Sequence, residues 1–242
     1  MAPSTTYDLA LYPASGPGLG HLMRCMALAE WAVELKAKVI AITQESSLVW
    51  PCSLLTSGGI SARIAIADGL SAQPGGGAQH WRIIDGLNDG SGPAYGYIYP
   101  HFGAVPVPGF PTFVGPQWMP LRRGFEMWGP GGKRAAAAVT YRAPTDAWGL
   151  PLRAQTGQQA AECFREAEAA WVPPSTVAYE ALASGCALVL HRQSGSLEIG
   201  QAMHDAAVAT WWDGTGGPPV LIKRKERPID GLGAKRLLEA LL

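Results

Sequence analysis

The sequence predicts an α/β protein built from two small halves, each with a parallel sheet. Apolar, strand-like runs alternate with segments of helical periodicity over residues 7–85, and the same alternation returns over residues 135–242. Strands that alternate with helices form parallel sheets with right-handed crossovers. Between the two patterns lies a stretch rich in Gly, Pro and aromatic residues, and its Gly129–Gly132 run is the best candidate for a hinge. We therefore expect domains over residues 1–130 and 131–242.

Composition favours a globular protein of the cytoplasm. Of the 242 residues 48% are apolar and 16% are charged, and 19 basic residues balance 19 acidic ones. A neutral chain gives no support for a strongly basic nucleic-acid binder, although a local basic patch stays possible. The N-terminus lacks the pattern of a secretion signal, and no apolar stretch approaches the ~18–20 residues of a membrane span. We expect neither secretion nor a membrane span.

The cysteines and histidines predict no metal. The four cysteines lie far apart and form no C-x-x-C pair, which is typical of reduced thiols. The five histidines show no H-x-x-x-H or similar metal-ligand spacing. We expect neither a metal ion nor another bound cofactor.

The first half is expected to contain one amphipathic helix over residues 22–38. Its apolar residues recur at helical spacing, as Leu22, Met26, Ala29 and Val33 do. β-Branched and apolar runs bounded by turn residues predict the strands of this half. These strands are expected at 7–12, 39–43, 61–67 and 81–85.

The second half repeats the pattern with shorter elements. Gly185 follows a helical segment at the position where glycine commonly ends helices. Strands are expected at 135–141, 171–173 and 187–191, and helices at 158–170, 176–184, 197–209 and 229–242. Two such halves facing a cleft would make that cleft the default binding site.

A glycine-rich turn between the first strand and the first helix is the strongest functional signal. Gly18 and Gly20 let backbone approach a ligand, and the N–H groups at the helix start attract anions such as a diphosphate. His21 follows at once, and Arg24 lies one turn further on. A histidine with an ordinary pKa of about 6.5 suits activation of a hydroxyl or water. We expect the positive helix end to depress the pKa of His21; on spacing alone, a structural and a catalytic role are equally supported.

A second signal precedes the helix at 176–184. Ser175 is a typical N-cap, and with the N–H groups of the first turn it could hold phosphate oxygens. Glu180 on that helix could accept hydrogen bonds from ribose hydroxyls. The alternative is an ordinary capped helix with a solvent-facing glutamate.

Four segments then occur in one order along the chain. They are Gly18–Arg24, Val114–Arg122 with its G-P-Q-x-x-P-L-R pattern, Ser175–Gly185, and Asp230–Arg236 with its D-G-x-G-A-x-R pattern. This order resembles the UDP-sugar hydrolase of the pseudaminic acid pathway and the related spore-coat polysaccharide proteins. Those proteins share the GT-B architecture of many glycosyltransferases. The resemblance implies a GT-B-like fold of two small Rossmann-like domains that face a cleft, and a UDP-sugar or other NDP-sugar as substrate.

The resemblance also assigns roles to residues. It implies that His21 is the base that activates water against the anomeric carbon, and that Ser175, Thr176 and Glu180 contact the nucleotide. Gln201 matches one member of an Asn-Gln pair near the sugar and phosphates; the asparagine has no counterpart here. The residues expected to bind substrate or phosphate are Gly18, Gly20, Arg24, Asp85, Ser175, Thr176, Glu180 and Gln201. For Asp85, a loop-capping role is an equal alternative.

One departure from the family stands out. Its members usually begin the second domain with a strand ending in a Gly-Gly-x-Asp loop, then a helix and another strand. Residues 142–146 replace that loop here, and at least one strand-helix unit is missing. The C-terminal nucleotide-binding half is therefore expected to be shortened.

Three functions follow from these observations. The first, which the resemblance over most of the chain favours, is hydrolysis of an NDP-sugar, in which His21 deprotonates water. The alternative is an inverting glycosyltransferase, whose acceptor hydroxyl could belong to a glycan or a modified nucleic-acid base. The shortened C-terminal half and the aromatic-rich region 95–118 favour that alternative. A non-catalytic protein that binds sugar nucleotides is the third. The nucleotide, the acceptor and the oligomeric state stay open.

Overall fold

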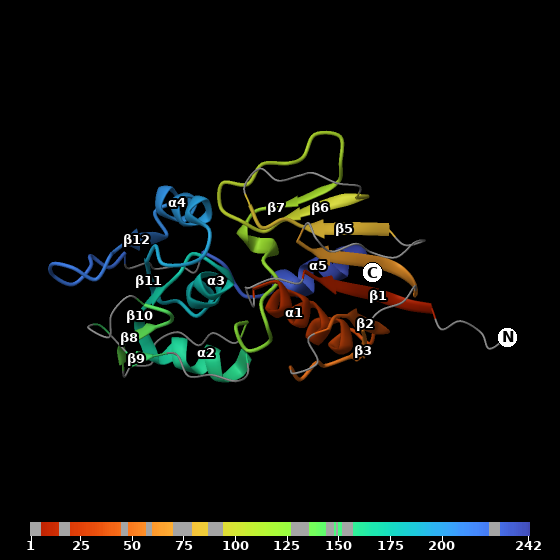
Figure 1. Cartoon of the computed structure of the whole chain (residues 1–242), viewed down its shortest axis with the longest axis horizontal. Coiled ribbons are helices and arrows are strands. Elements are labelled where there is room, and N and C mark those ends of the chain that lie inside the picture. Colours follow the sequence, from red (N-terminus) through yellow and green to blue (C-terminus); the bar gives the residue numbers. More distant parts are fainter. Residues whose placement is uncertain are drawn as a thin grey trace. The chain divides into compact units, whose positions relative to one another are not determined.

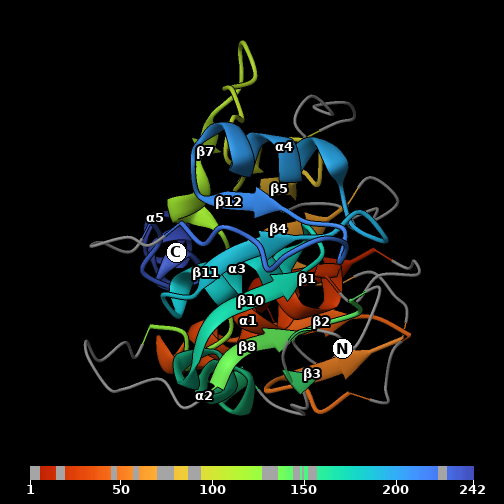
Figure 2. The ribbon, with the colours of Figure 1, turned by 90° about the vertical axis from the view of Figure 1, so that its left-hand side faces the viewer.

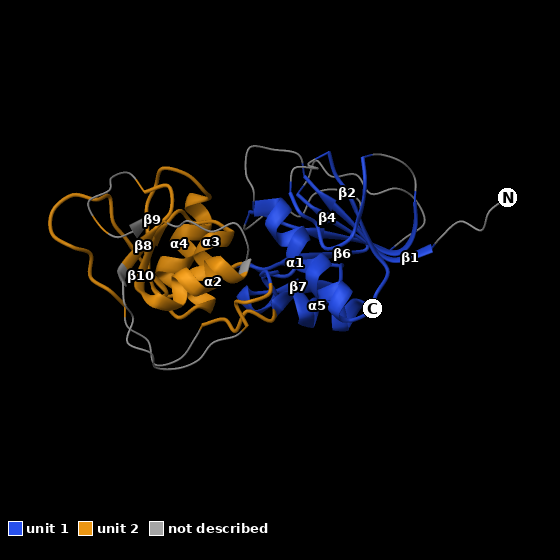
Figure 3. Ribbon diagram, turned by 90° about the horizontal axis from the view of Figure 1, so that it is seen from below, with its two compact units in different colours: residues 1–100, 104–122, 233–242 blue, residues 101–103, 123–232 orange. Residues whose placement is uncertain are grey.

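The structure, a computed structural model, is an α/β fold with two parallel sheets (Figure 1). The residues that it describes are 6–14, 20–44, 48–56, 60–69, 79–86, 94–126, 136–143, 148, 150–151, 157–222 and 228–242. The chain divides into two compact units (Figure 3). Unit 1 comprises residues 1–100, 104–122 and 233–242, and unit 2 comprises residues 101–103 and 123–232.

The sheet of unit 1 has the strand order β3-β2-β1-β4-β5-β6-β7, and all its neighbouring strands are parallel. Its central strands are buried on both faces, as in β1, where Leu9, Ala10 and Leu11 are fully buried. The strands are β1 (Thr6–Pro13), β2 (Val39–Ile42), β3 (Ser53–Leu55), β4 (Ser61–Asp68), β5 (Gln79–Ile83), β6 (Gly96–Tyr99) and β7 (Thr112–Val114).

The helix α1 (Gly20–Glu34) begins directly after the glycine-rich turn and packs on β1 and β2. Its buried face includes Leu22, Cys25, Leu28 and Ala32. The helix ends four residues before the predicted end at 38, because Lys36 takes a left-handed conformation with φ 60°. That conformation cannot continue a right-handed helix.

The sheet of unit 2 has the order β12-β11-β10-β8-β9 and is also parallel throughout (Figure 2). Its strands are β8 (Ala136–Thr140), β9 (Leu150–Pro151), β10 (Ala167–Val172), β11 (Ala187–Leu190) and β12 (Ala209–Trp211). Its helices are α2 (Gly157–Glu166), α3 (Thr176–Ala183) and α4 (Leu197–Asp205).

Two predicted helices of unit 2 extend too far: the one predicted over 197–209 ends at Asp205. The helix predicted over 158–170 ends at Glu166, and strand β10 begins at Ala167. The run Ala167-Glu168-Ala169-Ala170 favours helix by propensity, but it lies between β8 and β11 and pairs with both. Small side chains fit a strand that is buried on both faces, so tertiary pairing outweighs the local preference.

The last helix, α5 (Gly233–Leu241), belongs to unit 1. It packs on α1 and on the short 3-10 helix η1 (Pro116–Trp118), and Arg236 donates to the carbonyl of Gln117. A Cβ on Gly233 would lie 2.3 Å from the carbonyl oxygen of Met119, so only glycine permits this approach. The D-G-x-G and G-P-Q segments thus serve to dock α5.

The units differ from the domains predicted at residue 130. Residues 123–126 belong to unit 2, and α5 belongs to unit 1. The predicted hinge at 129–132 lies outside the described residues. In the part of the chain that the structure describes, no helix is long and apolar enough to cross a membrane.

Candidate functional site

The sheet of unit 1 reverses its strand order between β1 and β4. From β1 the chain moves outward through β2 to β3, then crosses to β4 and moves outward the other way to β7. Pro13 lies opposite Asp68 in the parallel pair, and the N–H of Ala14 donates to the Asp68 carbonyl at 2.8 Å. Open α/β sheets bind ligands outside the carboxyl ends of two such strands. The ends of β1 and β4 are therefore the place to look for a site.

A histidine, an aspartate and an arginine meet at this point. His21, the second residue of α1, places Nδ1 2.7 Å from Oδ1 of Asp68, the last residue of β4. Arg24 donates from Nη2 to the same oxygen at 2.7 Å and from Nε to Oδ2 at 2.8 Å. Residues three apart lie on one face of a helix, so α1 presents both side chains to the aspartate.

These hydrogen bonds determine which nitrogen of His21 carries the proton. A carboxylate only accepts hydrogen bonds, so Nδ1–H donates to Asp68. Nη2 of Arg24 also lies 3.0 Å from Nδ1. A protonated Nδ1 offers no lone pair, so the guanidinium donates to Asp68 instead. Nε2 then keeps its lone pair and can accept a proton.

Asp85 brings a second carboxylate to His21 from the loop after β5. Its Oδ1 lies 2.9 Å from Nη1 of Arg24, and its Oδ2 lies 3.6 Å from Nε2 of His21. The Asp85 side chain is 53% exposed and that of His21 is 19% exposed, whereas Asp68 is fully buried. The cluster therefore has a buried end at Asp68 and a solvent-facing end at Asp85.

The expected depression of the His21 pKa is wrong. The hydrogen bond to Asp68 raises the pKa of His21 above its ordinary 6.5, and the charges of Asp68 and Asp85 act in the same direction. Burial and the charge of Arg24 oppose the rise. A carboxylate in direct contact with the ring outweighs the partial charge of a helix terminus.

Arg24 remains a cation in spite of its burial. Burial disfavours its charge, but attraction and hydrogen bonds from Asp68, together with Asp85, raise the pKa of Arg24 above its ordinary value. The neighbouring Cys25 is fully buried, and burial raises the pKa of its thiol well above the ordinary range. The thiol is therefore neutral and adds no charge beside the cluster.

Glycine after β4 makes room for the imidazole. Gly69 has φ +95°, and a Cβ there would lie 2.8 Å from the Cβ of Ala14 and 3.1 Å from Cε1 of His21. Gly20, predicted to bind phosphate, is the first residue of α1, and Gly18 lies outside the described residues.

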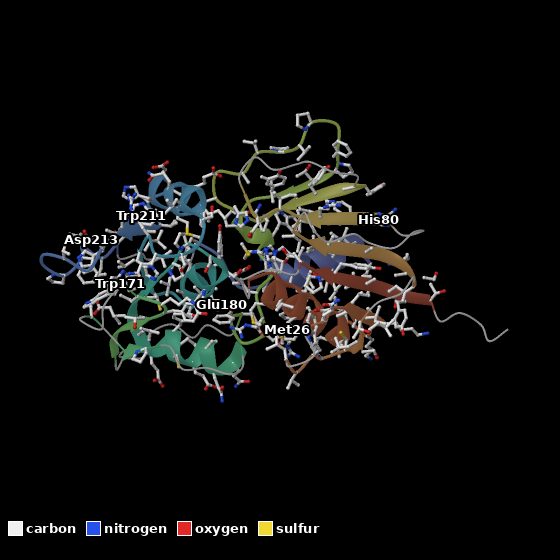
Figure 4. The ribbon with its side chains drawn as sticks, in the orientation of Figure 1. Met26, His80, Trp171, Glu180, Trp211 and Asp213 are labelled. Carbon is white, nitrogen blue, oxygen red and sulfur yellow. The ribbon has the colours of Figure 1, made fainter. Side chains whose placement is uncertain are left out.

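The second predicted group lies in unit 2 at the start of α3 (Figure 4). Ser175 precedes the helix in an extended conformation, and its side chain makes no capping hydrogen bond. Thr176 is buried, and Glu180 is 4% exposed. The alternative of a solvent-facing glutamate is therefore wrong for Glu180.

Gln201 lies on the exposed face of α4, where its Nε2 donates to Oδ1 of Asp205 at 2.8 Å. The residue before it, Gly200, packs on the ring of Trp211, which Figure 4 labels. A Cβ on Gly200 would lie 2.5 Å from that ring. In this chain Trp211 thus fills the space beside α4 that any side chain at 200 would need.

The structure brings together His21, Arg24 and Asp85 among the predicted residues of unit 1. In unit 2, Ser175 and Thr176 lie at the start of α3, and Glu180 lies one turn further along the same helix. The residue that sequence reasoning missed is Asp68. Its signal was an acidic residue at the end of an apolar strand and just before Gly69, a pattern that loop-capping residues share.

Among the described residues, no three His, Cys, Asp or Glu side chains are arranged to hold a metal ion. The chemistry that the cluster itself can perform is proton transfer at Nε2 of His21.

The sequence matches no protein-family model and no curated protein. Among solved structures, the chain is similar to Spinosyn Forosaminyltransferase SpnP, with a TM-score of 0.57 and 10% sequence identity. The match covers 98% of this chain and 91% of the neighbour. At this identity the likeness establishes the fold, which is GT-B-like as the sequence resemblance implied. Hydrolysis and the pseudaminic acid pathway gain no support from this likeness.

Proposed function

We propose that this chain transfers a sugar from a nucleotide sugar to an acceptor hydroxyl, with His21 as the general base. The observation that carries the proposal is the imidazole of His21 at the switch point of unit 1, held through Nδ1 by the buried Asp68, which leaves Nε2 as the nitrogen that can take up a proton. The structural neighbour is named as a forosaminyltransferase, which supports group transfer over hydrolysis.

In this reaction Nε2 takes the proton of the acceptor hydroxyl as its oxygen attacks the anomeric carbon. The bond between that carbon and the diphosphate oxygen breaks, and the electron pair leaves with the nucleoside diphosphate. Attack opposite the leaving group inverts the anomeric centre. Asp68 keeps the ring in one orientation and stabilises the imidazolium that forms, as the third member of a catalytic triad does.

The nucleotide is assigned to unit 2. The first turn of α3 offers backbone N–H groups to an anion. Ser175 stands at the N-cap position, and its hydroxyl makes no capping hydrogen bond to this helix. UDP is the nucleotide that the sequence resemblance implies. Thr176 and Glu180 follow on the same helix start and are proposed to shape this nucleotide site.

The test is release of nucleoside diphosphate from a panel of UDP-, GDP- and dTDP-sugars, with and without glycan acceptors. We expect release that depends on an acceptor. Equal release without acceptor would make the protein a hydrolase, and no release under any condition would overturn both activities. His21→Ala should lower release by about 10²–10⁴-fold. The matched control is His80→Ala. His80 lies near the amino end of β5, at the opposite edge of the sheet from His21, and its variant should keep the wild-type rate of release.

A further inference from the structure

The cluster around His21 carries more negative than positive charge while the imidazole is neutral. Among the residues that the structure describes, the charged groups that face His21 are Arg24 of α1, Asp68 of β4 and Asp85 after β5. Two carboxylates and one guanidinium leave a net charge of −1. Protonation of Nε2 brings the cluster to neutrality.

The two carboxylates differ in how they are held. Both oxygens of Asp68 accept hydrogen bonds from Arg24, at 2.7 and 2.8 Å, in the two-point geometry that pairs arginine with carboxylate. The charge of Asp68 is thereby matched by the guanidinium. Asp85 shares the same guanidinium, with its Oδ1 2.9 Å from Nη1, and its Oδ2 lies 3.6 Å from Nε2 of His21.

We propose that Asp85 supplies the counter-charge for the imidazolium that forms when His21 takes a proton from the acceptor. This inference rests on the proposed function. Asp85 lies on the Nε2 side, where the proton arrives, whereas Asp68 lies on the Nδ1 side. The growing positive charge on the ring is then attracted by Asp85, the carboxylate on the side of the ring where the proton arrives.

The electrostatic half of the proposal is tested by NMR titration of the His21 ring in the full chain, its signal assigned by its loss in His21→Ala. Asp85→Asn should move the midpoint of the His21 titration to lower pH. Asp85→Glu keeps the charge and should restore the wild-type midpoint. Glu34→Gln removes one exposed carboxylate from the far end of α1 and should have no effect. An unchanged midpoint in Asp85→Asn, or a Glu variant that behaves like Asn, would overturn the proposal.

The catalytic half is tested with the donor found in the release assay. At a pH above the titration midpoints of both proteins, where His21 is unprotonated in wild type and variant, Asp85→Asn should lower kcat by about tenfold, since a half-exposed charge is partly screened by water. The donor KM should stay unchanged. A wild-type kcat in Asp85→Asn would overturn the catalytic role. If the wild-type protein releases nothing from any donor, the proposed function fails, and the titration still decides whether Asp85 acts on His21.

Discussion

Each unit places a histidine at the carboxyl edge of its sheet, and the two histidines have opposite surroundings. His21 in unit 1 contacts Asp68, and this contact raises its pKa. His191 in unit 2 follows β11 and is 1% exposed. Its Nε2–H donates to the carbonyl of Tyr141 at 3.0 Å, and the N–H of Gln193 lies 3.4 Å from its Nδ1. Burial lowers the pKa of His191 below 6.5.

The neighbours explain the contrast. Around His191 the strand ends carry indole rings: Trp171 lies edge-on to the imidazole at 6.1 Å and tilts against Trp212 at 4.5 Å. These rings offer no negative charge to stabilise an imidazolium. A histidine at the carboxyl edge of a parallel sheet thus contacts a carboxylate in one unit and bonds to the carbonyl of the residue after β8 in the other. The residues that face each histidine therefore set the direction of its pKa shift.

Loss of Asp68 should produce the largest effect. Asp68→Ala leaves Arg24 buried without its main partner, and we expect unit 1 to lose about 3 kcal/mol of stability. Hydrogen exchange should show faster exchange in β1, α1 and β4 and unchanged exchange in β10 and β11. Asp205→Ala, an exposed carboxylate of α4, is the control and should alter neither unit. Equal loss of protection in both units would contradict this separation.

The two histidines should titrate in opposite directions from 6.5. The raised pKa of His21 means that its stabilising contribution is complete below about pH 6.5 and is lost as pH rises through its folded pKa. The lowered pKa of His191 means that its contribution is present above 6.5 and is lost as pH falls. NMR titration should place the midpoint of His21 above that of His191. The rate of release should rise with pH as His21 loses its proton.

The smallest effect concerns two serines of unit 2 that stand at helix starts. Ser196 accepts from the N–H of Ile199 at 3.4 Å, whereas Ser175 makes no such bond. Ser196→Ala should cost about 0.5–1 kcal/mol, and Ser175→Ala should cost less, as measured by exchange in α4 and α3. If Ser175 binds phosphate, its variant should raise the donor KM while Ser196→Ala does not. The reverse order of stabilities would show that Ser175 caps α3.

Sequence reasoning found the parts of the fold and site that depend on local pattern. Helical spacing of apolar residues located α1, and a glycine-rich turn located His21 at its start. Asp68 is different, because its role depends on β4 lying beside β1, across a crossover of many residues. No spacing within the chain reveals that contact.

The same limit explains the errors in both units. Strand β10 pairs with β8 and β11, so its alanines take the conformation that their neighbours impose. The strands β3, β9 and β12 have only two or three residues each, too few to show a strand pattern in the sequence. They form because they pair with neighbouring strands. The pKa of His21 was expected to fall because only the helix terminus was visible in the sequence.

The docking of α5 has a consequence for how the protein is made. Unit 1 needs residues 233–242, which leave the ribosome after the whole of unit 2. Unit 2 draws nearly all its residues from one uninterrupted stretch, 123–232, and can pack as soon as that stretch has emerged. During synthesis unit 2 can therefore pack before unit 1 is complete, and the face of α1 that receives α5 stays uncovered until residues 233–242 have emerged.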